Sequence, residues 1–277
     1  MTMLSINTNV GALKAATASY SVNKSMETSM NRLSTGKRIN SAADDAAGLQ
    51  ISQRLTAEIR GIDQAIRNAA DGQSMLATAE GATIEIHAIL QRMRELAVQA
   101  ANGTMATADR TAVNSEFVAL EAEINRINDN TTWNGILLTQ GSFINTVGGH
   151  FNVGPDADQV INHDIANLAT TAIGLVDAIT MATRAGANAA ITAIDQAISV
   201  VGTEREQMGA VMNRLDHAVA NLSNVSTNLK VAKGRIEDAD FAAETANLAR
   251  TQVLQQASMA MLSQANASKQ NILALFQ

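Results

Sequence analysis

Four histidines, His87, His150, His163 and His217, are the side chains best suited to acid–base or metal chemistry. No pair of them has the His-Glu-x-x-His spacing that places two imidazoles on one helical face for zinc. His87 and His217 fall beside apolar rows of predicted helices, where a structural or solvated role is favoured. His150 and His163 could meet near a predicted hairpin, but a zinc pair there is disfavoured. The sequence therefore predicts no metal site.

Two short polar motifs resemble phosphate-binding or catalytic patterns. Thr35-Gly36-Lys37-Arg38 lacks the upstream glycine of a phosphate-binding loop, so Gly36 is predicted to end a helix whose negative C-terminus attracts the two cations. Asp44-Asp45 could form a catalytic carboxylate pair, but it precedes a long apolar repeat. Together with Ser41 it is predicted to cap that helix. No enzyme and no cofactor are predicted.

The composition favours long helices over sheets. The 277 residues are 46% hydrophobic, with 3% aromatics and a single proline. The net charge of −6 argues against nucleic-acid binding, which needs a cationic face. No apolar run approaches the ~18 residues of a membrane span, and the absence of cysteine excludes disulfides and thiolate metal sites. The first residues lack the pattern of a cleaved signal peptide.

Apolar residues recur every seven positions in the C-terminal half of the chain. The first row is Ile194, Val201, Met208, Leu215, Leu222, Leu229 and Ile236. A second row, three residues after members of the first, is Val211, Ala218, Val225 and Ala232. Such a seam predicts a left-handed coiled coil.

A matching helix is predicted over residues 44–101. Its apolar row includes Leu55, Ile62 and Leu90, and its register is predicted to shift by one residue between Gly72 and Gly81. A third helix is expected over 106–128, followed by a turn at Asn134-Gly135. One short hairpin is predicted near 140–155, with strands 143–147 and 150–153 on either side of Gly148-Gly149, and 161–175 is expected to be loop.

Both ends of the chain carry only thin apolar rows. These rows contain Ile6, Val10, Leu13 and Leu33 near the start, and Leu254, Met261, Ile272 and Phe276 near the finish. Alone in water, such helices have little apolar area to offset a backbone ordering cost of ~1–2 kcal/mol per residue. The ends must pair with each other, pair with neighbouring molecules or stay unfolded, so they are the parts of the chain whose folding is predicted to depend on assembly.

Motifs at both ends resemble those of bacterial flagellins. They include Ile6-Asn7-Thr8-Asn9, Arg32-Leu33-Ser34-Thr35-Gly36, the segments 38–48, 91–99 and 235–241, Asn213-Arg214-Leu215 and Trp133-Asn134-Gly135. Trp133 departs from the family's pattern, in which Phe usually precedes Asn-Gly at this turn. The motifs cover about the first 155 residues and the last 90.

The resemblance implies a mainly α fold: a long-helix coiled-coil bundle with discontinuous N- and C-terminal helices paired in an inner domain. Residues 1–43 and 237–277 would form that inner domain, and 44–236 a rod-like domain. Family members usually carry a variable outer domain after the hairpin. Here only about 25 residues separate Pro155 from the next helical stretch near Ala178, which implies a short form and a smooth, thin filament.

The resemblance also implies a structural subunit of the flagellar filament, secreted by type III export and self-assembling for swimming motility. The implied partners are further copies of the chain, an export chaperone, the filament cap, hook-junction proteins and a host Toll-like receptor, with no nucleic acid and no membrane. Arg92, Leu96 and Glu116 match receptor-contacting positions, although contacts between subunits are the preferred native role. The alternatives are a hook–filament junction protein and a polysaccharide-capturing surface homologue.

Overall fold

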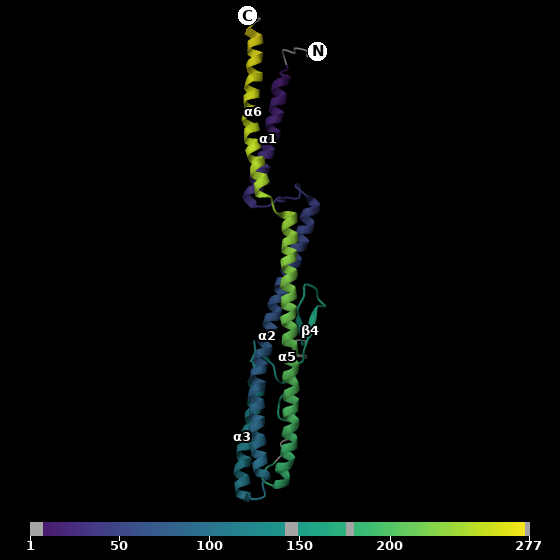
Figure 1. Ribbon diagram of the computed structural model, residues 1–277, viewed down its shortest axis with the longest axis vertical. Coiled ribbons are helices and arrows are strands. Elements are labelled where there is room, and N and C mark those ends of the chain that lie inside the picture. The colour runs from purple at the N-terminus through teal and green to yellow at the C-terminus, as the bar shows by residue number, and fades with distance from the viewer. Residues whose placement is uncertain (1–7, 142–148, 176–179, 275–277) are drawn as a thin grey trace. The chain divides into compact units, whose positions relative to one another are not determined.

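The computed structural model describes residues 8–141, 149–175 and 180–274, with side chains as far as residue 268. Within these ranges the chain is mainly helical, as predicted (Figure 1). The helices are α1 (Val10–Thr35), α2 (Ala46–Ala101), α3 (Thr107–Asn130), α5 (Arg184–Glu237) and α6 (Phe241–Ala274). The short strands are β1 (Thr132–Trp133), β2 (Ile136–Leu137), β3 (His150–Asn152) and β4 (Val160–Asn162).

The chain forms two compact units. Residues 1–57 and 228–277 make up one, here called the terminal unit, and residues 58–227 make up the other, here called the central unit. The predicted divisions at 43/44 and 236/237 lie beside interruptions of the helices at residues 36–45 and 238–240. The compact units instead divide at 57/58 and 227/228, within α2 and α5, so each of these helices contributes residues to both units.

Local side-chain chemistry explains where the first two helices begin and end. Gly36 follows α1 in the left-handed conformation, with φ of 70°, so its predicted role as a helix end is confirmed. The Asp45 carboxylate accepts a hydrogen bond from the Gly48 backbone N–H at 2.9 Å, at the first turn of α2. At the other end of α2, the Arg110 guanidinium donates to the Ala100 carbonyl at 2.9 Å, which satisfies an acceptor that the helix leaves open.

The core of the central unit is built on two apolar rows. On α5, Ile194, Val201, Met208 and Leu215 are fully buried, and Leu222 is also buried. The matching row on α2 runs without interruption, at alternating spacings of three and four, through Ile62, Ala65, Ala69, Gly72, Leu76, Ala79, Thr83, Ile86, Leu90, Met93, Ala97 and Ala100. The remaining predicted members, Leu55 and Leu229, lie in the terminal unit and are half-buried.

The predicted register shift between Gly72 and Gly81 is wrong, because Gly72 is itself a core position. A Cβ placed on Gly72 would lie 2.7 Å from the Phe151 ring, so the missing side chain makes room for an aromatic from β3. Gly81 faces open space instead. The α2 row thus continues straight through Gly72, with Phe151 filling the position that a side chain would take.

The structure contains two small antiparallel hairpins within the described residues, where the sequence predicted one. β1 pairs with β2 across the predicted turn at Asn134-Gly135, both of which have positive φ. β3 pairs with β4, which lies in a stretch predicted to be loop. The predicted partner strand, 143–147, falls outside the described residues. The β3–β4 pairing places Phe151 opposite Ile161, and both join the apolar cluster between α2 and α5.

Candidate functional site

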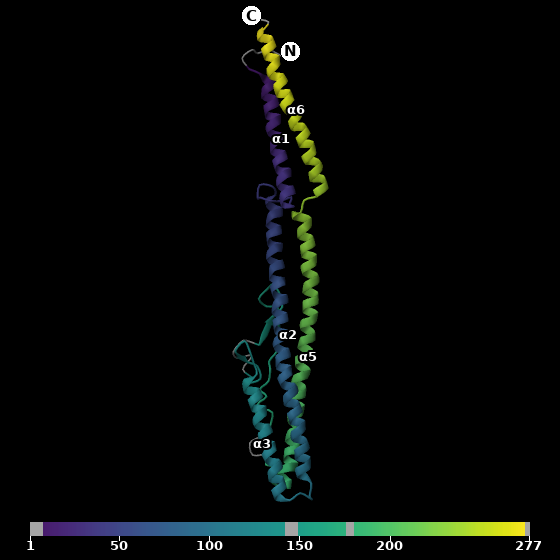
Figure 2. The same ribbon diagram turned by 90° about the vertical axis from the view of Figure 1, so that its left-hand side faces the viewer.

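The terminal helices α1 and α6 pack against each other in an antiparallel pair (Figures 1 and 2). Near the start of α1, the Asn9 side-chain amide donates to the Ala265 carbonyl at 3.1 Å. Near its end, Arg32 lies 3.8 Å from the Glu244 carboxylate. These two contacts fix the direction and the register of the pair.

The facing sides of the two helices are lined mainly by small or polar residues. The least exposed residues of α1 follow a three–four spacing: Ala12, Ala15, Ser19, Val22, Met26, Ser29 and Leu33. Those of α6 do the same: Glu244, Leu248, Thr251, Gln255, Ser258, Leu262 and Ala265. This is the geometry of a coiled-coil seam, but few of its side chains bury much apolar surface. The α1–α6 contact alone is therefore weak.

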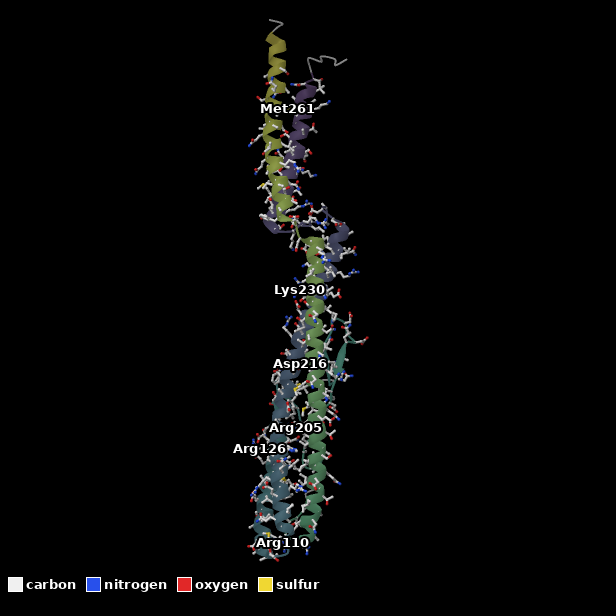
Figure 3. All side chains as sticks on the ribbon, in the orientation of Figure 1. Arg110, Arg126, Arg205, Asp216, Lys230 and Met261 are labelled. Atoms are coloured by element: carbon white, nitrogen blue, oxygen red, sulfur yellow. The ribbon has the colours of Figure 1, made fainter. Side chains whose placement is uncertain are left out.

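The residues of the thin apolar rows, for which the resemblance implies a role in polymerisation, lie mostly outside this seam. Val10, Leu13, Leu254 and Met261 are exposed, whereas Leu33 lies in the seam. Leu13 is 60% exposed and Met261 is 65% exposed; Figure 3 labels Met261 on α6. Ile6 and Phe276 fall outside the described residues, as does the side chain of Ile272.

The exposed apolar residues form a stripe on each terminal helix. At ~100° per residue, Val10, Leu13 and Tyr20 group on the side of α1 roughly opposite the seam. Leu254 and Met261, seven residues apart, share one flank of α6. We call these the α1 stripe and the α6 stripe. Exposed apolar rows of this kind mark surfaces where further helices pack.

A buried carboxylate, Glu237, ties together the helix ends within the terminal unit. One oxygen lies 2.5 Å from the Lys37 ammonium, and the other accepts a hydrogen bond from the Ser52 hydroxyl at 2.7 Å. These two contacts, and the nearby Lys233 ammonium, hold the pKa of Glu237 below its usual value. A backbone hydrogen bond adds to these side-chain contacts: the Arg38 N–H donates to the Glu237 carbonyl at 2.6 Å.

The predicted contact patch on α2 and α3 is only partly at the surface. The Arg92 guanidinium pairs with Glu116 at 2.9 Å and with Glu95 at 3.0 Å. These hydrogen-bonded carboxylates raise the pKa of Arg92. Leu96, however, is only 2% exposed and belongs to the core cluster that includes Phe117 of α3. Its assignment to a contact surface is therefore wrong, because its side chain is buried in this cluster.

One buried ionisable pair was missed by the sequence analysis. His163 lies 3.7 Å from Glu204 of α5, and both side chains are almost inaccessible to solvent. Burial lowers the pKa of His163 and raises the pKa of Glu204, so the site favours the neutral forms of both. The sequence did contain a signal for this buried carboxylate. Glu204 lies three residues after Val201 and four before Met208, at a position of the apolar seam where a charged residue is unexpected.

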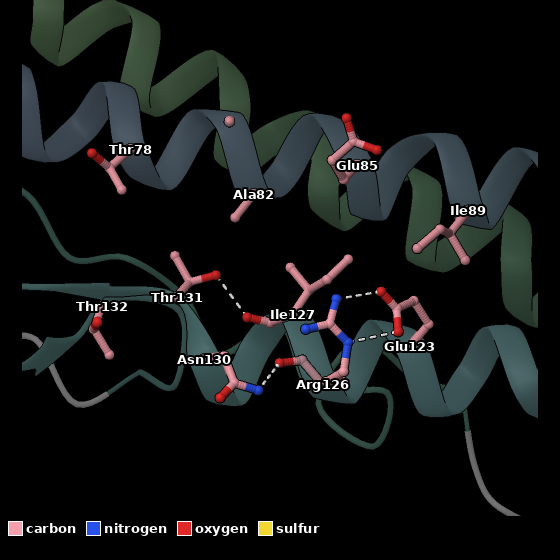
Figure 4. Close-up of a pocket in the computed structure, with 11 residues that line it drawn as sticks. Thr78, Ala82, Glu85, Ile89, Glu123, Arg126, Ile127, Asn130, Thr131 and Thr132 are labelled. Atoms are coloured by element: carbon pink, nitrogen blue, oxygen red, sulfur yellow. Dashed lines mark hydrogen bonds and ion pairs between the residues drawn. The ribbon is translucent and has the colours of Figure 1, made fainter.

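A groove of about 580 Å³ separates part of α2 from α3 in the central unit (Figure 4). Its polar groups are largely paired within α3: Arg126 bonds to Glu123, and the Asn130 and Thr131 side chains donate to backbone carbonyls. Among the described residues, no group of three or more potential metal ligands is found. In the same residues, no helix is both long and apolar enough to cross a membrane.

Comparison with known proteins places this architecture in a family. The model of the bacterial flagellin N-terminal helical region matches residues 6–143, and that of the C-terminal helical region matches residues 191–276. A flagellin of Halalkalibacterium halodurans is 44% identical over 98% of this chain and 99% of its own length. A flagellin of Bacillus subtilis is 39% identical over the same shares of the two chains.

A solved structure agrees with these sequence matches. The crystal structure of Bacillus cereus flagellin, 32% identical, aligns with a TM-score of 0.50 over 60% of this chain and 94% of that one. The family models cover both helical ends, and the full-length relatives extend the match across nearly the whole chain. This chain therefore belongs to the bacterial flagellin family.

Proposed function

We propose that this flagellin assembles by coupled folding, in which the terminal helices become stably ordered only on contact with other copies of the chain. As a flagellin, the protein is a structural subunit of the flagellar filament, an extracellular structure that serves motility. In the proposed mechanism, the terminal helices drive polymerisation because they bury too little apolar surface within one chain.

The thin seam between α1 and α6 supports this proposal. Its two buried residues on α1 are Ala15 and Ser29, neither of which buries a large apolar side chain. Ordering costs ~1–2 kcal/mol per residue, so further burial must come from elsewhere. The α1 and α6 stripes offer it, at ~25 cal/mol for each Å² of apolar surface removed from water.

An open helical filament requires contacts in which one patch meets a different patch on the next copy. Two unlike stripes on α1 and α6 meet that requirement. In this proposal the role of the chain is structural and not enzymatic.

The family resemblance suggests further partners for the same chain. We extend the proposal to type III export, with a chaperone on the C-terminal helix, and to the filament cap and hook-junction proteins. A host Toll-like receptor would meet the exposed Arg92 and Glu116, but not the buried Leu96. Loss of signalling by Arg92→Ala monomer in reporter cells would support this contact, and undiminished signalling would remove it.

The stripes are tested by a double variant, Leu13→Ser with Leu254→Ser. Both leucines are exposed in the single chain, so the helical content of the monomer should not change. The concentration needed for polymerisation should rise at least about tenfold, because each buried leucine contributes ~1.5–3 kcal/mol. Sedimentation of filaments and electron microscopy provide the measurement.

The matched control is Leu13→Met with Leu254→Met, which keeps an apolar side chain of similar volume. This variant should polymerise like the wild type. If the serine variant also polymerised at the wild-type concentration, the stripes would not be the assembly contacts. Amides of α1 and α6 that exchange slowly in the free monomer would likewise contradict coupled folding.

A further inference from the structure

The methionines of this chain are distributed unevenly between exposed and buried positions. Of its 12 methionines, the six in the central unit are buried or half-buried: Met75, Met93, Met105, Met181, Met208 and Met212. The described methionines that are exposed all lie in the terminal unit: Met30, Met259 and Met261. Accessible thioethers are thus concentrated on the helices that carry the proposed assembly surface.

Met261 is an exposed methionine that lies within the proposed assembly surface. It lies seven residues after Leu254, two helical turns along, and so belongs to the α6 stripe. Met259 projects from another side of α6, since two residues span ~200° of the helix. Met30, near the end of α1, is 54% exposed.

We propose that Met30, Met259 and Met261 are oxidant-sensitive modification sites on the terminal helices, at which a peroxide converts the thioethers to sulfoxides, and that oxidation of Met261 in the α6 stripe blocks self-association. The proposal rests on the proposed function of the terminal helices. In each step the sulfur lone pair attacks one peroxide oxygen, an S–O bond forms and the O–O bond breaks. The sulfur loses two electrons, and the departing oxygen, with both peroxide protons, leaves as water.

A sulfoxide at Met261 makes the α6 stripe less favourable to bury against another copy of the chain. It replaces a flexible apolar group by a strongly polar one, which is unfavourable to bury without a hydrogen-bond partner. The central-unit core would keep its thioethers, because Met93 and Met208 are fully buried. Oxidation therefore removes the capacity to assemble while leaving the fold of the central unit intact, and reduction of the sulfoxide restores that capacity.

The test uses full-length monomer treated with hydrogen peroxide and then mapped by peptide mass spectrometry. Sulfoxide should form at Met30, Met259 and Met261 at least about tenfold faster than at Met93 and Met208, because susceptibility follows exposure. The treated protein should keep its circular dichroism spectrum, but need an about tenfold higher concentration to polymerise. Methionine sulfoxide reductase with a thiol should reverse the change.

The control replaces the three exposed methionines with leucine, as Met30→Leu, Met259→Leu and Met261→Leu in one chain. This variant should polymerise before and after peroxide treatment. The inference is overturned if the oxidised wild type assembles as well as the untreated protein, or if peroxide inactivates the leucine variant equally. Failure of the untreated wild type to polymerise would overturn the proposed function as well, so the two failures are distinguishable.

Discussion

Glu237 is the residue on which the contacts around the helix ends of the terminal unit converge. Its carboxylate is buried, yet it meets Lys37, Lys233 and the Ser52 hydroxyl. A buried carboxylate is tolerated only when it is paired and hydrogen-bonded, and here both oxygens have partners. Residues from α2, α5 and the segment after α1 are thereby held together by one side chain.

The lowered pKa of Glu237 predicts acid sensitivity of the terminal unit. Because the folded-state pKa lies below the ordinary value of 4.5, the stabilisation is fully present above that value. It is lost as the pH falls through the folded-state pKa. Glu237→Gln should cost about 1–2 kcal/mol at neutral pH and flatten the loss of stability in acid. Hydrogen exchange of the α2 and α5 amides that belong to the terminal unit, residues 46–57 and 228–237, measures both effects at several pH values.

The control for this prediction is Glu206→Gln, which removes an exposed carboxylate from α5 in the central unit. It should leave exchange in residues 46–57 and 228–237 unchanged at every pH. Equal acid sensitivity in the wild type and in Glu237→Gln would show that another group is responsible.

Gly72 is a core position of α2 with no room for a side chain beside Phe151. Gly72→Ala would push a methyl group to within 2.7 Å of the Phe151 ring, and overpacking of this kind costs about 1–3 kcal/mol. The matched change Gly81→Ala meets nothing within 4 Å and should stabilise α2 by about 0.5–1 kcal/mol. The fluorescence of the single tryptophan, Trp133, reports urea unfolding of the central unit, because it packs against the same cluster. Equal effects of the two substitutions would contradict the close approach of β3 to α2.

The periodicity of apolar residues predicted the long helices well. The helix expected over 44–101 begins at Ala46 and ends at Ala101, because the cap at Asp45 and the break at Asn102-Gly103 are local signals. The pairing of β3 with β4 could not be predicted from local pattern, since it depends on Phe151 and Ile161 reaching the same core.

The sequence predicted only part of the candidate site on the terminal helices α1 and α6. The sequence identifies apolar rows on the terminal helices, but it does not say which side of each helix meets its partner. In α1, small and polar residues such as Ala15 and Ser29 take the seam, while Leu13 points elsewhere. Leu96 was misassigned because a helix covered on two sides buries a wider face than one apolar row suggests.

The seam on α5 leads to a prediction that compares two leucines. Leu215 is fully buried in the central unit, whereas Leu229 is half-buried in the terminal unit. Leu215→Ala should destabilise the central unit by about 2–5 kcal/mol, the usual cost of a core cavity. Leu229→Ala should leave the transition followed by Trp133 fluorescence almost unchanged. A comparable loss from both would mean that the two ends of the α5 seam unfold as one cooperative unit.

The central unit and the terminal unit differ in how much apolar surface they bury. The central unit contains the two large apolar clusters, built from α2, α3, α5 and the hairpins. The terminal helices instead expose large apolar side chains, among them Tyr20, Phe241 and Val253. Stability of the monomer and the ability to polymerise should therefore be separable properties of one chain.

Removal of residues 237–277 tests that separation directly. The deletion takes away α6, the α6 stripe and the carboxylate of Glu237, but no residue of the central unit. We expect a soluble, helical monomer whose Trp133 unfolding transition matches that of the full chain, because the apolar clusters around Trp133 are retained. It should form no filaments at concentrations where the full chain polymerises, since α1 then lacks both its seam partner and the neighbouring α6 stripe. Filaments of the truncated protein in electron micrographs would contradict the assembly role of α6, and a shifted Trp133 transition would contradict the independence of the central unit.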